Sequence, residues 1–172
     1  MAVRKHRQVE TRMVSEYVVQ EYAQFPVIQR VPLGKISEAL LAEQGTAKAI
    51  KYSRPFRPEV DAVVILPQYL VLIEAKVWQV MNGLGKLPMY KSLVQHTPEL
   101  RPYLPRDIIL ELVVARTDSN LEIMARDAGI RLKVYLPEWL QEVIAGLNVY
   151  WTKAYHEKRQ DTLALREYFG VD

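Results

Sequence analysis

The segment Val60–Lys76, with the sequence VDAVVILPQYLVLIEAK, consists of two apolar runs joined by a short proline-containing turn. Runs rich in valine, isoleucine and leucine on either side of a turn predict a β-hairpin. Each run nevertheless carries charge, with Asp61 in the first run and Glu74 and Lys76 in the second. Because charged side chains are seldom buried without a partner, these three residues are candidates for a functional site.

The register of this hairpin determines whether its charges meet. A turn centred on Pro67 and Gln68 places Asp61 directly opposite Glu74, and the period of a strand puts Lys76 on the same face of the sheet. Pro67 cannot adopt the positive φ of a tight turn, but a symmetric larger loop keeps the same pairing, whereas a bulge would break it. Directly opposed side chains have Cβ atoms about 4.5–5.5 Å apart, where like charges are destabilising. The register therefore predicts a cluster of two acids and one lysine.

Two carboxylates held this close need a shared proton or a cation between them. Oxygen ligands suit Mg²⁺ or Mn²⁺, which bind through one or two carboxylates and keep water molecules for a phosphate-bearing substrate. A nearby lysine could orient a water molecule or stabilise charge on the phosphate. The structural alternative is a surface salt bridge, because the same register sets Glu59 opposite Lys76. We favour the metal site, since the salt bridge leaves Asp61 against Glu74 unexplained.

Length and composition limit the remaining classes of protein. The 172 residues, 49% hydrophobic and 25% charged, predict one globular domain over residues 1–172. No apolar run reaches the roughly 18 residues of a membrane span, and the first residues lack a signal-peptide pattern, so we expect a soluble, cytoplasmic protein. With no cysteine and three scattered histidines, a metal would be bound through oxygen. The net charge of +3 permits a polyanionic partner.

Helical and extended patterns alternate along the chain before the hairpin. In order, we expect a helix over about residues 6–24 that Pro26 ends, a strand over 27–34, a short helix capped by Ser37 and stopped near Gly45, and a basic loop over 48–59. The first helix has an apolar face formed by Met13, Val14, Tyr17, Val18 and Phe25.

The same alternation continues after the hairpin. We expect a helix that opens with glycines and has Pro88 close to its start, a strand over 107–117, a helix capped by Asp118 or Ser119 and stopped by Gly129, a strand over 130–137, and C-terminal helices. This order predicts an α/β fold with a mixed central β-sheet flanked by helices on both faces.

The charged residues of the hairpin also match a known pattern. Asp61, followed on the next strand by Glu74-Ala-Lys76, resembles the motif of the PD-(D/E)xK nuclease superfamily, with Pro58-Glu59-Val60-Asp61 as a degenerate first half. The similarity extends over most of the chain, because an acid-bearing helix precedes the hairpin and a helix, a strand, a helix and a strand follow it. The resemblance implies a restriction-endonuclease-like core and metal-dependent cleavage of phosphodiester bonds in DNA.

The resemblance implies a role for each residue of the motif. Asp61 and Glu74 would bind Mg²⁺ or Mn²⁺ together with the carbonyl of Ala75, and Lys76 would assist the attacking water. Members of the superfamily often add a glutamate from the first helix to this set. The candidates are Glu10, Glu16 and Glu21.

Helical spacing ranks these three glutamates. Glu10 is followed by Met13, Val14 and Tyr17 at spacings of three, four and seven, so it shares the face that packs toward the sheet. Glu16 points elsewhere, and Glu21 lies near the end of the helix. We therefore rank Glu10 first, with a solvated glutamate as the alternative.

Further residues are candidates for DNA binding. Many relatives carry Gln-x-x-x-Tyr in the helix after the E-x-K motif, and this chain has Lys86 and Tyr90 at the matching positions. Lys86 replaces a neutral amide by a cation, which could contact a phosphate or be solvated, with Tyr90 as packing. The cations of the basic loop would either contact the phosphates of the DNA backbone or simply be solvated. These cations are Lys48, Lys51, Arg54 and Arg57.

Two hypotheses of different classes follow. The first is a Mg²⁺-dependent deoxyribonuclease with Asp61, Glu74, Lys76 and Glu10 in the catalytic site. The alternative is a non-catalytic protein of the same fold, a structural or DNA-binding component of a phage particle or DNA-processing assembly, which would be virion-associated and have a homo-oligomer or assembly partner. The intact acid and lysine set favours the enzyme, and the departure at Lys86 favours the alternative.

Overall fold

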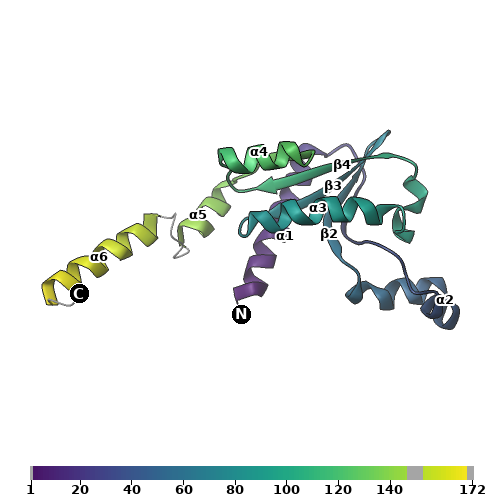
Figure 1. The fold of residues 1–172 in the computed structure, drawn as a ribbon, viewed down its shortest axis with the longest axis horizontal. Helices are drawn as coiled ribbons and strands as arrows, with labels where there is room; N and C mark the ends of the chain where they lie inside the picture. Colours follow the sequence, from purple (N-terminus) through teal and green to yellow (C-terminus); the bar gives the residue numbers. More distant parts are fainter. Residues whose placement is uncertain (1, 147–152, 170–172) are drawn as a thin grey trace. The chain divides into compact units, whose positions relative to one another are not determined.

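The computed structural model describes residues 2–146 and 153–169 of the chain, and side chains from Arg7 onward (Figure 1). It contains two compact units, Met1–Tyr135 and Leu136–Asp172. The single domain expected from the length stays a prediction. Among the helices of the described residues, none is both long and apolar enough to cross a membrane.

A five-stranded mixed sheet forms the centre of the first unit, with the strand order β1-β2-β3-β4-β5. Strands β1 (Val27–Pro32), β2 (Glu59–Ile65) and β3 (Tyr69–Lys76) pair antiparallel. Strands β4 (Asp107–Val114) and β5 (Ile130–Val134) continue the sheet parallel to β3. The parallel pairs require helical crossovers, which α3 (Val80–Val94) and α4 (Ser119–Asp127) provide. The predicted α/β class with a mixed sheet is confirmed.

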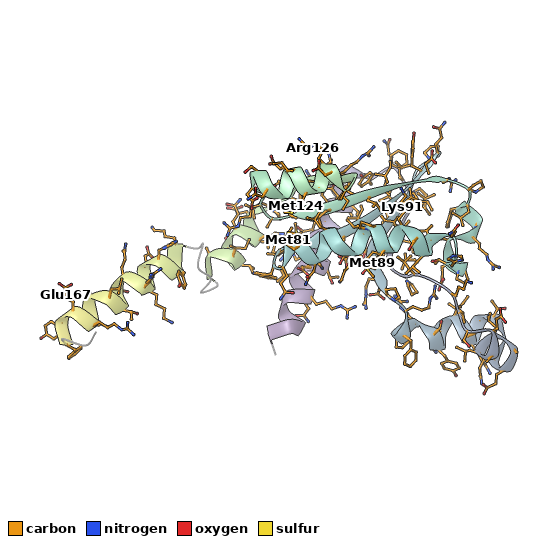
Figure 2. The ribbon with its side chains drawn as sticks, in the orientation of Figure 1. Met81, Met89, Lys91, Met124, Arg126 and Glu167 are labelled. Atoms are coloured by element: carbon orange, nitrogen blue, oxygen red, sulfur yellow. The ribbon has the colours of Figure 1, made fainter. Side chains whose placement is uncertain are left out.

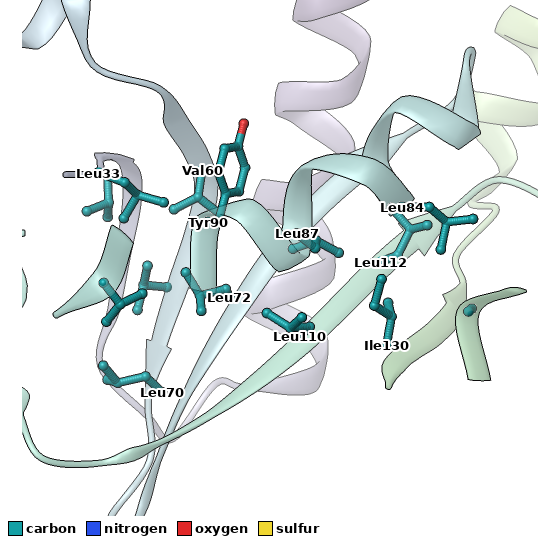
Figure 3. Packing of buried hydrophobic residues seen from close by; sticks show 14 of the residues in the cluster. Leu33, Val60, Leu70, Leu72, Leu84, Leu87, Tyr90, Leu110, Leu112 and Ile130 are labelled. Carbon is teal, nitrogen blue, oxygen red and sulfur yellow. The ribbon is translucent and has the colours of Figure 1, made fainter. Parts of the chain in front are cut away.

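Helices flank both faces of the sheet, as predicted. The leucines at alternate positions of β3 and β4 pack with α3 and α4 in one apolar cluster, which Figure 3 shows from close by. Glu111 lies between two of these leucines in β4 and so points to the other face, where the hydroxyl of Tyr17 from α1 (Ala2–Glu21) donates to Glu111 Oε1 (2.9 Å). The predicted apolar face of α1 is buried at Met13, Val14, Tyr17 and Val18.

Several predicted helix ends are confirmed. The Asp118 carboxylate accepts from the N–H groups of Asn120 and Leu121 (2.9 Å each) and so caps α4. Gly129 has a φ of 66° and ends that helix. The C-terminal helices are α5 (Glu138–Gly146) and α6 (Lys153–Phe169). A 3₁₀ segment, η2 (Pro98–Tyr103), was not predicted.

The basic segment before the hairpin is helical, so its prediction as a loop is wrong. Helix α2 spans Glu38–Ser53 and is followed by a 3₁₀ turn, η1 (Arg54–Phe56). Gly45 does interrupt the helix with φ 71° and ψ 163°, close to the predicted stop, but the helix resumes beyond it. Alanine and lysine favour helix, and the full burial of Ala49 gives the resumed helix a packed side.

Helix α3 begins earlier than predicted. It includes both glycines of the segment NGLGK, so Pro88 lies inside the helix and not near its start. The reason is the contact of Gly83 with the sheet. A Cβ atom at this position would lie 2.6 Å from Leu112 Cδ1 and 3.0 Å from Lys76 Cγ, so only glycine lets α3 approach so closely.

Candidate active site

The hairpin of β2 and β3 has the predicted register. Ala62 lies opposite Ile73, and the ladder continues in step to the turn. The paired ladder ends at Ala62 and Ile73, and Asp61 and Glu74 are the next residues of the two strands. Two acids from neighbouring strands therefore come to one end of the hairpin, where β3 ends at Lys76.

Both neighbours of β2 show an irregularity beside Asp61. Toward β3, the Ala75 N–H donates to Asp61 Oδ2 (2.9 Å), so an acid side chain helps to join the two strands. Toward β1, the register sets Arg30 opposite Asp61, and its φ of 56° lies in the left-handed region that a residue other than glycine seldom adopts. Local backbone strain of this kind is frequent at functional sites. The strained residue, Arg30, faces Asp61, which the sequence pattern predicted for the site.

Glu74 is buried together with positive charge. The residue is 1% exposed. Its Oε1 atom lies 3.1 Å from Lys76 Nζ and 3.4 Å from Lys86 Nζ. Its Oε2 atom is buried and has no hydrogen-bond partner among the described residues. Lys86 comes from α3, so the helix that Gly83 holds against the sheet also brings a cation to Glu74.

Glu10 joins this cluster from α1, as its helical spacing predicted. Its Oε2 atom lies 3.3 Å from Lys76 Nζ, and its Oε1 atom accepts from the Val77 N–H (3.1 Å). Because α1 covers the other face of the sheet, Glu10 reaches the site around the end of β3. The structure thus brings together the acids Glu10, Asp61 and Glu74 and the cations Lys76 and Lys86.

The electrostatics of the cluster shift two of its ionisable groups. Burial, and after it the charge of Glu74, raises the pKa of Asp61 to about 7, although the Ala75 N–H and Lys76 oppose the rise. For Lys76, burial lowers the pKa, but Glu74, Glu10 and Asp61 more than offset it and hold the pKa above its ordinary value. Lys76 is therefore a cation, and Asp61 is partly protonated near neutral pH.

These groups line a cleft with a volume of about 590 Å³. Tyr90 lines the same cleft and its hydroxyl donates to the main-chain carbonyl of Glu59 (3.2 Å). Burial, followed by Glu74 and Asp61, raises the Tyr90 pKa, so this side chain is a neutral hydrogen-bonding group. The predicted pair Lys86 and Tyr90 thus lies at the site, on one face of α3.

The donor set of the cleft fits a hard divalent cation. No three acidic or histidine side chains form a ready-made metal site within the residues that the structure describes. Mg²⁺ needs only one or two carboxylates, with water and substrate as its other ligands. Asp61, the Glu74 carboxylate with its unpartnered Oε2 atom, and the carbonyl of Ala75 could supply the protein ligands. Lys76 partly neutralises the two acids in the absence of an ion.

Three arginines surround Glu59 at the rim of the cleft. Glu59 Oε1 lies 3.0 Å from Arg7 Nη2 and 2.9 Å from Arg30 Nε, and Glu59 Oε2 lies 3.2 Å from Arg54 Nη2. The guanidinium side chains are 67%, 52% and 50% exposed. Although burial opposes it, bonds from Arg30 and Arg54 keep the Glu59 pKa low. Three cations on one carboxylate give the rim a positive charge that faces solvent.

Sequence reasoning missed two of these rim arginines. Arg7 comes from α1 and Arg30 from β1, far from the hairpin in sequence, and neither belongs to a motif. The rim also corrects the structural alternative for Lys76. Glu59 pairs with arginines, whereas Lys76 pairs with Glu10 and Glu74, so the alternative of a salt bridge between Glu59 and Lys76 is wrong.

Arg57 has a structural position and not the exposed one expected of a phosphate contact. Its side chain is 5% exposed, with Nη1 and Nη2 bonded to the two carboxylate oxygens of Glu99 (2.7 and 2.8 Å) and Nη2 also bonded to the carbonyl of Pro32 (2.7 Å). This buried fork holds η1 against η2. The sequence offers no sign of it, because Glu99 lies 42 residues away.

The remaining candidates lie outside the cleft. Lys51 is exposed on α2 and is not among the residues that line the cleft. Glu16 forms an ion pair with Arg12 (2.8 Å), and Glu21 is exposed at the end of α1.

The chain matches no protein-family model, no curated protein and no solved structure.

Proposed function

We propose that this protein is a Mg²⁺- or Mn²⁺-dependent deoxyribonuclease with a restriction-endonuclease-like core. The observation that carries the proposal is Glu74, a buried carboxylate with an unpartnered oxygen beside a second acid and a lysine in a cleft. An unsatisfied buried polar group costs about 1–3 kcal/mol, and more if it is charged. Such an arrangement is explained if a further ligand completes it during function.

The residues of the chain divide the work of phosphodiester hydrolysis among them. Asp61, Glu74 and the Ala75 carbonyl would hold the ion, which supplies charge stabilisation at the phosphate and a more acidic water molecule. Lys76 is held by two acids from different elements and is protonated, so it acts as a hydrogen-bond donor to a phosphate oxygen or to the water. Glu10 fixes the Lys76 ammonium through its own bond to Val77 N–H.

The positive rim supports DNA as the substrate. Arg7, Arg30 and Arg54 present half-exposed guanidinium groups beside the acids, and guanidinium groups bind phosphate in a bidentate geometry. Contacts of this kind bind the backbone without reading its sequence. We therefore expect binding that depends on salt more than on base sequence.

The decisive experiment incubates purified protein with supercoiled and linear DNA in Mg²⁺, in Mn²⁺ and in a chelator. We expect cleavage only with a metal ion, and none by the Asp61→Asn variant, which keeps the shape but loses the ligand charge. Asp127→Asn is the matched control, because Asp127 is exposed on α4 and outside the cleft. Cleavage by Asp61→Asn at the rate of the unchanged protein would contradict the proposal.

A second candidate function is non-catalytic DNA binding, as a component of a phage particle or DNA-processing assembly. The observation that favours it is Lys86, whose Nζ lies 3.4 Å from Glu74 Oε1 where the superfamily pattern has a glutamine. Two lysines beside Glu74 neutralise its charge without a metal ion. This candidate predicts metal-independent DNA binding without cleavage, and a gain of metal binding in Lys86→Gln.

A further inference from the structure

Helix α2 and the turn η1 carry exposed aromatic rings beside exposed cations. Phe56 is 88% exposed and Tyr52 is 51% exposed. Lys48, Lys51 and Arg54 lie on the same short stretch and are also exposed. We call these five residues the α2 surface. Single exposed apolar side chains are common on proteins, but two rings within five residues, interleaved with cations, form a patch of distinct chemistry.

The geometry of the helix puts these side chains on a free face. Lys48, Lys51 and Tyr52 are spaced by three and four residues and therefore share one side of α2. Ala49 and Ser53, which are 0% and 7% exposed, mark the side that packs against the protein. The lysines and the tyrosine are thus turned toward solvent, and Phe56 follows one turn later in η1.

The charge of the α2 surface is of one sign. No acid occurs between Gly45 and Glu59. Glu59 itself is bonded to Arg54 (3.2 Å) and belongs to the rim of the cleft. The α2 surface therefore continues directly into the arginine rim beside Asp61 and Glu74.

We propose that the α2 surface binds an unpaired DNA strand and leads it to the cleft. Tyr52 and Phe56 stack on bases, and Lys48, Lys51 and Arg54 neutralise phosphates. Every base has a face that can stack on an aromatic ring, so this mode tolerates any sequence. Bases of a duplex are already stacked on their neighbours, so the same rings discriminate in favour of single strands. The inference rests on the proposed function for the substrate of the cleft, but it makes a separate claim about strand preference.

The chemistry of the patch favours a nucleic acid over a protein partner. The apolar part consists of two separate rings surrounded by cations, whereas the core of a protein interface is depleted in charge and rich in contiguous apolar area. Met81 and Met89 on α3 offer a contrast. They are 55% and 66% exposed (Figure 2), but they lack an aromatic face, and nothing in the structure shows what covers them.

The test measures binding separately from cleavage. Fluorescence anisotropy with a labelled single strand of mixed sequence, and with the matching duplex, is recorded in a chelator at several salt concentrations. We expect Phe56→Ala to lower the affinity for the single strand by roughly 10-fold and to change duplex affinity less than about 2-fold, since stacking is lost only with unpaired bases. Phe56→Trp should restore single-strand binding. Lys51→Ala should reduce the salt slope by about 0.7 on the single strand.

Phe169→Ala is the matched control, because Phe169 is a 69% exposed ring on α6. Unchanged single-strand affinity in Phe56→Ala and Tyr52→Ala would overturn the inference, as would equal losses on single strand and duplex. Concentration-dependent dimers that Phe56→Ala abolishes would assign the patch to a second copy of the chain and also overturn it. Because binding is measured without a metal ion, a protein that binds single strands through these rings but never cleaves DNA would contradict only the proposed nuclease function.

Discussion

Glu74 and Glu111 are acids on neighbouring strands of one sheet, and both are fully buried, but they have opposite surroundings. Glu111, 0% exposed, accepts from the hydroxyl groups of Tyr17 (2.9 Å) and Tyr22 (2.9 and 3.0 Å), which occupy both of its oxygens. Glu74, 1% exposed, has ammonium groups at one oxygen and no hydrogen-bond partner at the other among the described residues. Burial alone therefore does not separate a structural acid from a functional one.

The difference lies in whether the hydrogen bonds are complete. Burial raises the Glu111 pKa, the two tyrosine bonds oppose that rise, and the carboxyl group has no need of a further partner. Its role is to attach α1 to the sheet, and α1 carries Glu10 to the other acid. Glu111, whose hydrogen bonds are complete, thus helps to hold α1 in the position from which Glu10 reaches the site of Glu74.

The largest expected effect is on cleavage. If the contrast is functional, Glu74→Gln should lower the cleavage rate by at least about 1000-fold, because a ligand charge is lost. Glu111→Gln keeps the shape and an oxygen acceptor for the tyrosines, so we expect activity within about 5-fold of the unchanged protein. Rates are measured on the same DNA at saturating Mg²⁺, after circular dichroism has shown both variants to be folded. Equal loss in the two variants would remove the distinction.

The next effect concerns the lysine between the acids. Lys76→Ala should lower turnover by about 100- to 1000-fold while metal affinity changes little, because a positioned donor to the phosphate or water is lost. Lys91→Ala is the control, since Lys91 is exposed on α3 outside the cleft (Figure 2). Single-turnover kinetics and calorimetric titration with Mn²⁺ separate the two quantities. Normal turnover in the Lys76→Ala variant would exclude a catalytic role for Lys76 and leave it only the role of neutralising the acids beside it.

In contrast to cleavage, the stability of the fold should depend more on Glu111 than on Glu74. Glu111→Ala leaves the hydroxyl groups of Tyr17 and Tyr22 without their acceptor in a buried site and creates a cavity, so we expect a loss of about 3 kcal/mol in the free energy of unfolding. Glu74→Ala in a chelator also leaves a cavity and breaks the ion pair with Lys76, but it removes an unsatisfied oxygen and relieves the repulsion with Asp61, so we expect a smaller loss, about 1 kcal/mol. Urea unfolding measures both, and a larger loss for Glu74→Ala would contradict the comparison.

The last effect concerns the pH dependence of stability. The folded pKa of Asp61, about 7, lies above the ordinary value, so the folded state binds its proton more tightly than the unfolded state. Without metal, stability is therefore full below about pH 4 and falls as the pH rises toward 7, by on the order of 4 kcal/mol, because each pKa unit corresponds to about 1.4 kcal/mol. Because the Glu111 pKa is also raised, the difference between the unchanged protein and Asp61→Asn isolates the Asp61 contribution. Identical pH profiles for the two proteins would exclude the raised pKa.

The parts of the site that follow from local geometry were predictable. The turn fixed the hairpin register, and with it the meeting of Asp61 and Glu74, because strand pairing propagates in steps of one residue. The place of Glu10 followed from its helical spacing to buried residues. In both cases the position of the residue is determined within one helix or across one short turn.

Contacts between distant elements were not predictable in the same way. The buried pair of Arg57 with Glu99 and the meeting of Arg7, Arg30 and Arg54 depend on how separate elements pack. Helix α2 continued through a segment with loop-like prolines at its end because burial of Ala49 stabilised it. In each of these places the outcome depends on how separate elements pack, which a local sequence pattern does not contain.

Because Gly83 has no side chain, α3 packs directly on the sheet, and this limits which amino-acid substitutions the position can accept. Any side chain there must push against Leu112 and the stem of Lys76, so it would lift the helix that carries Lys86 and Tyr90 over the cleft. At Gly85, two residues on, an added Cβ atom would meet no atom within 4 Å, so this position is free to become alanine. In a library of single substitutions scored separately for abundance and for cleavage, position 83 would lose cleavage with even its smallest replacement, and position 85 would accept most residues that favour helix.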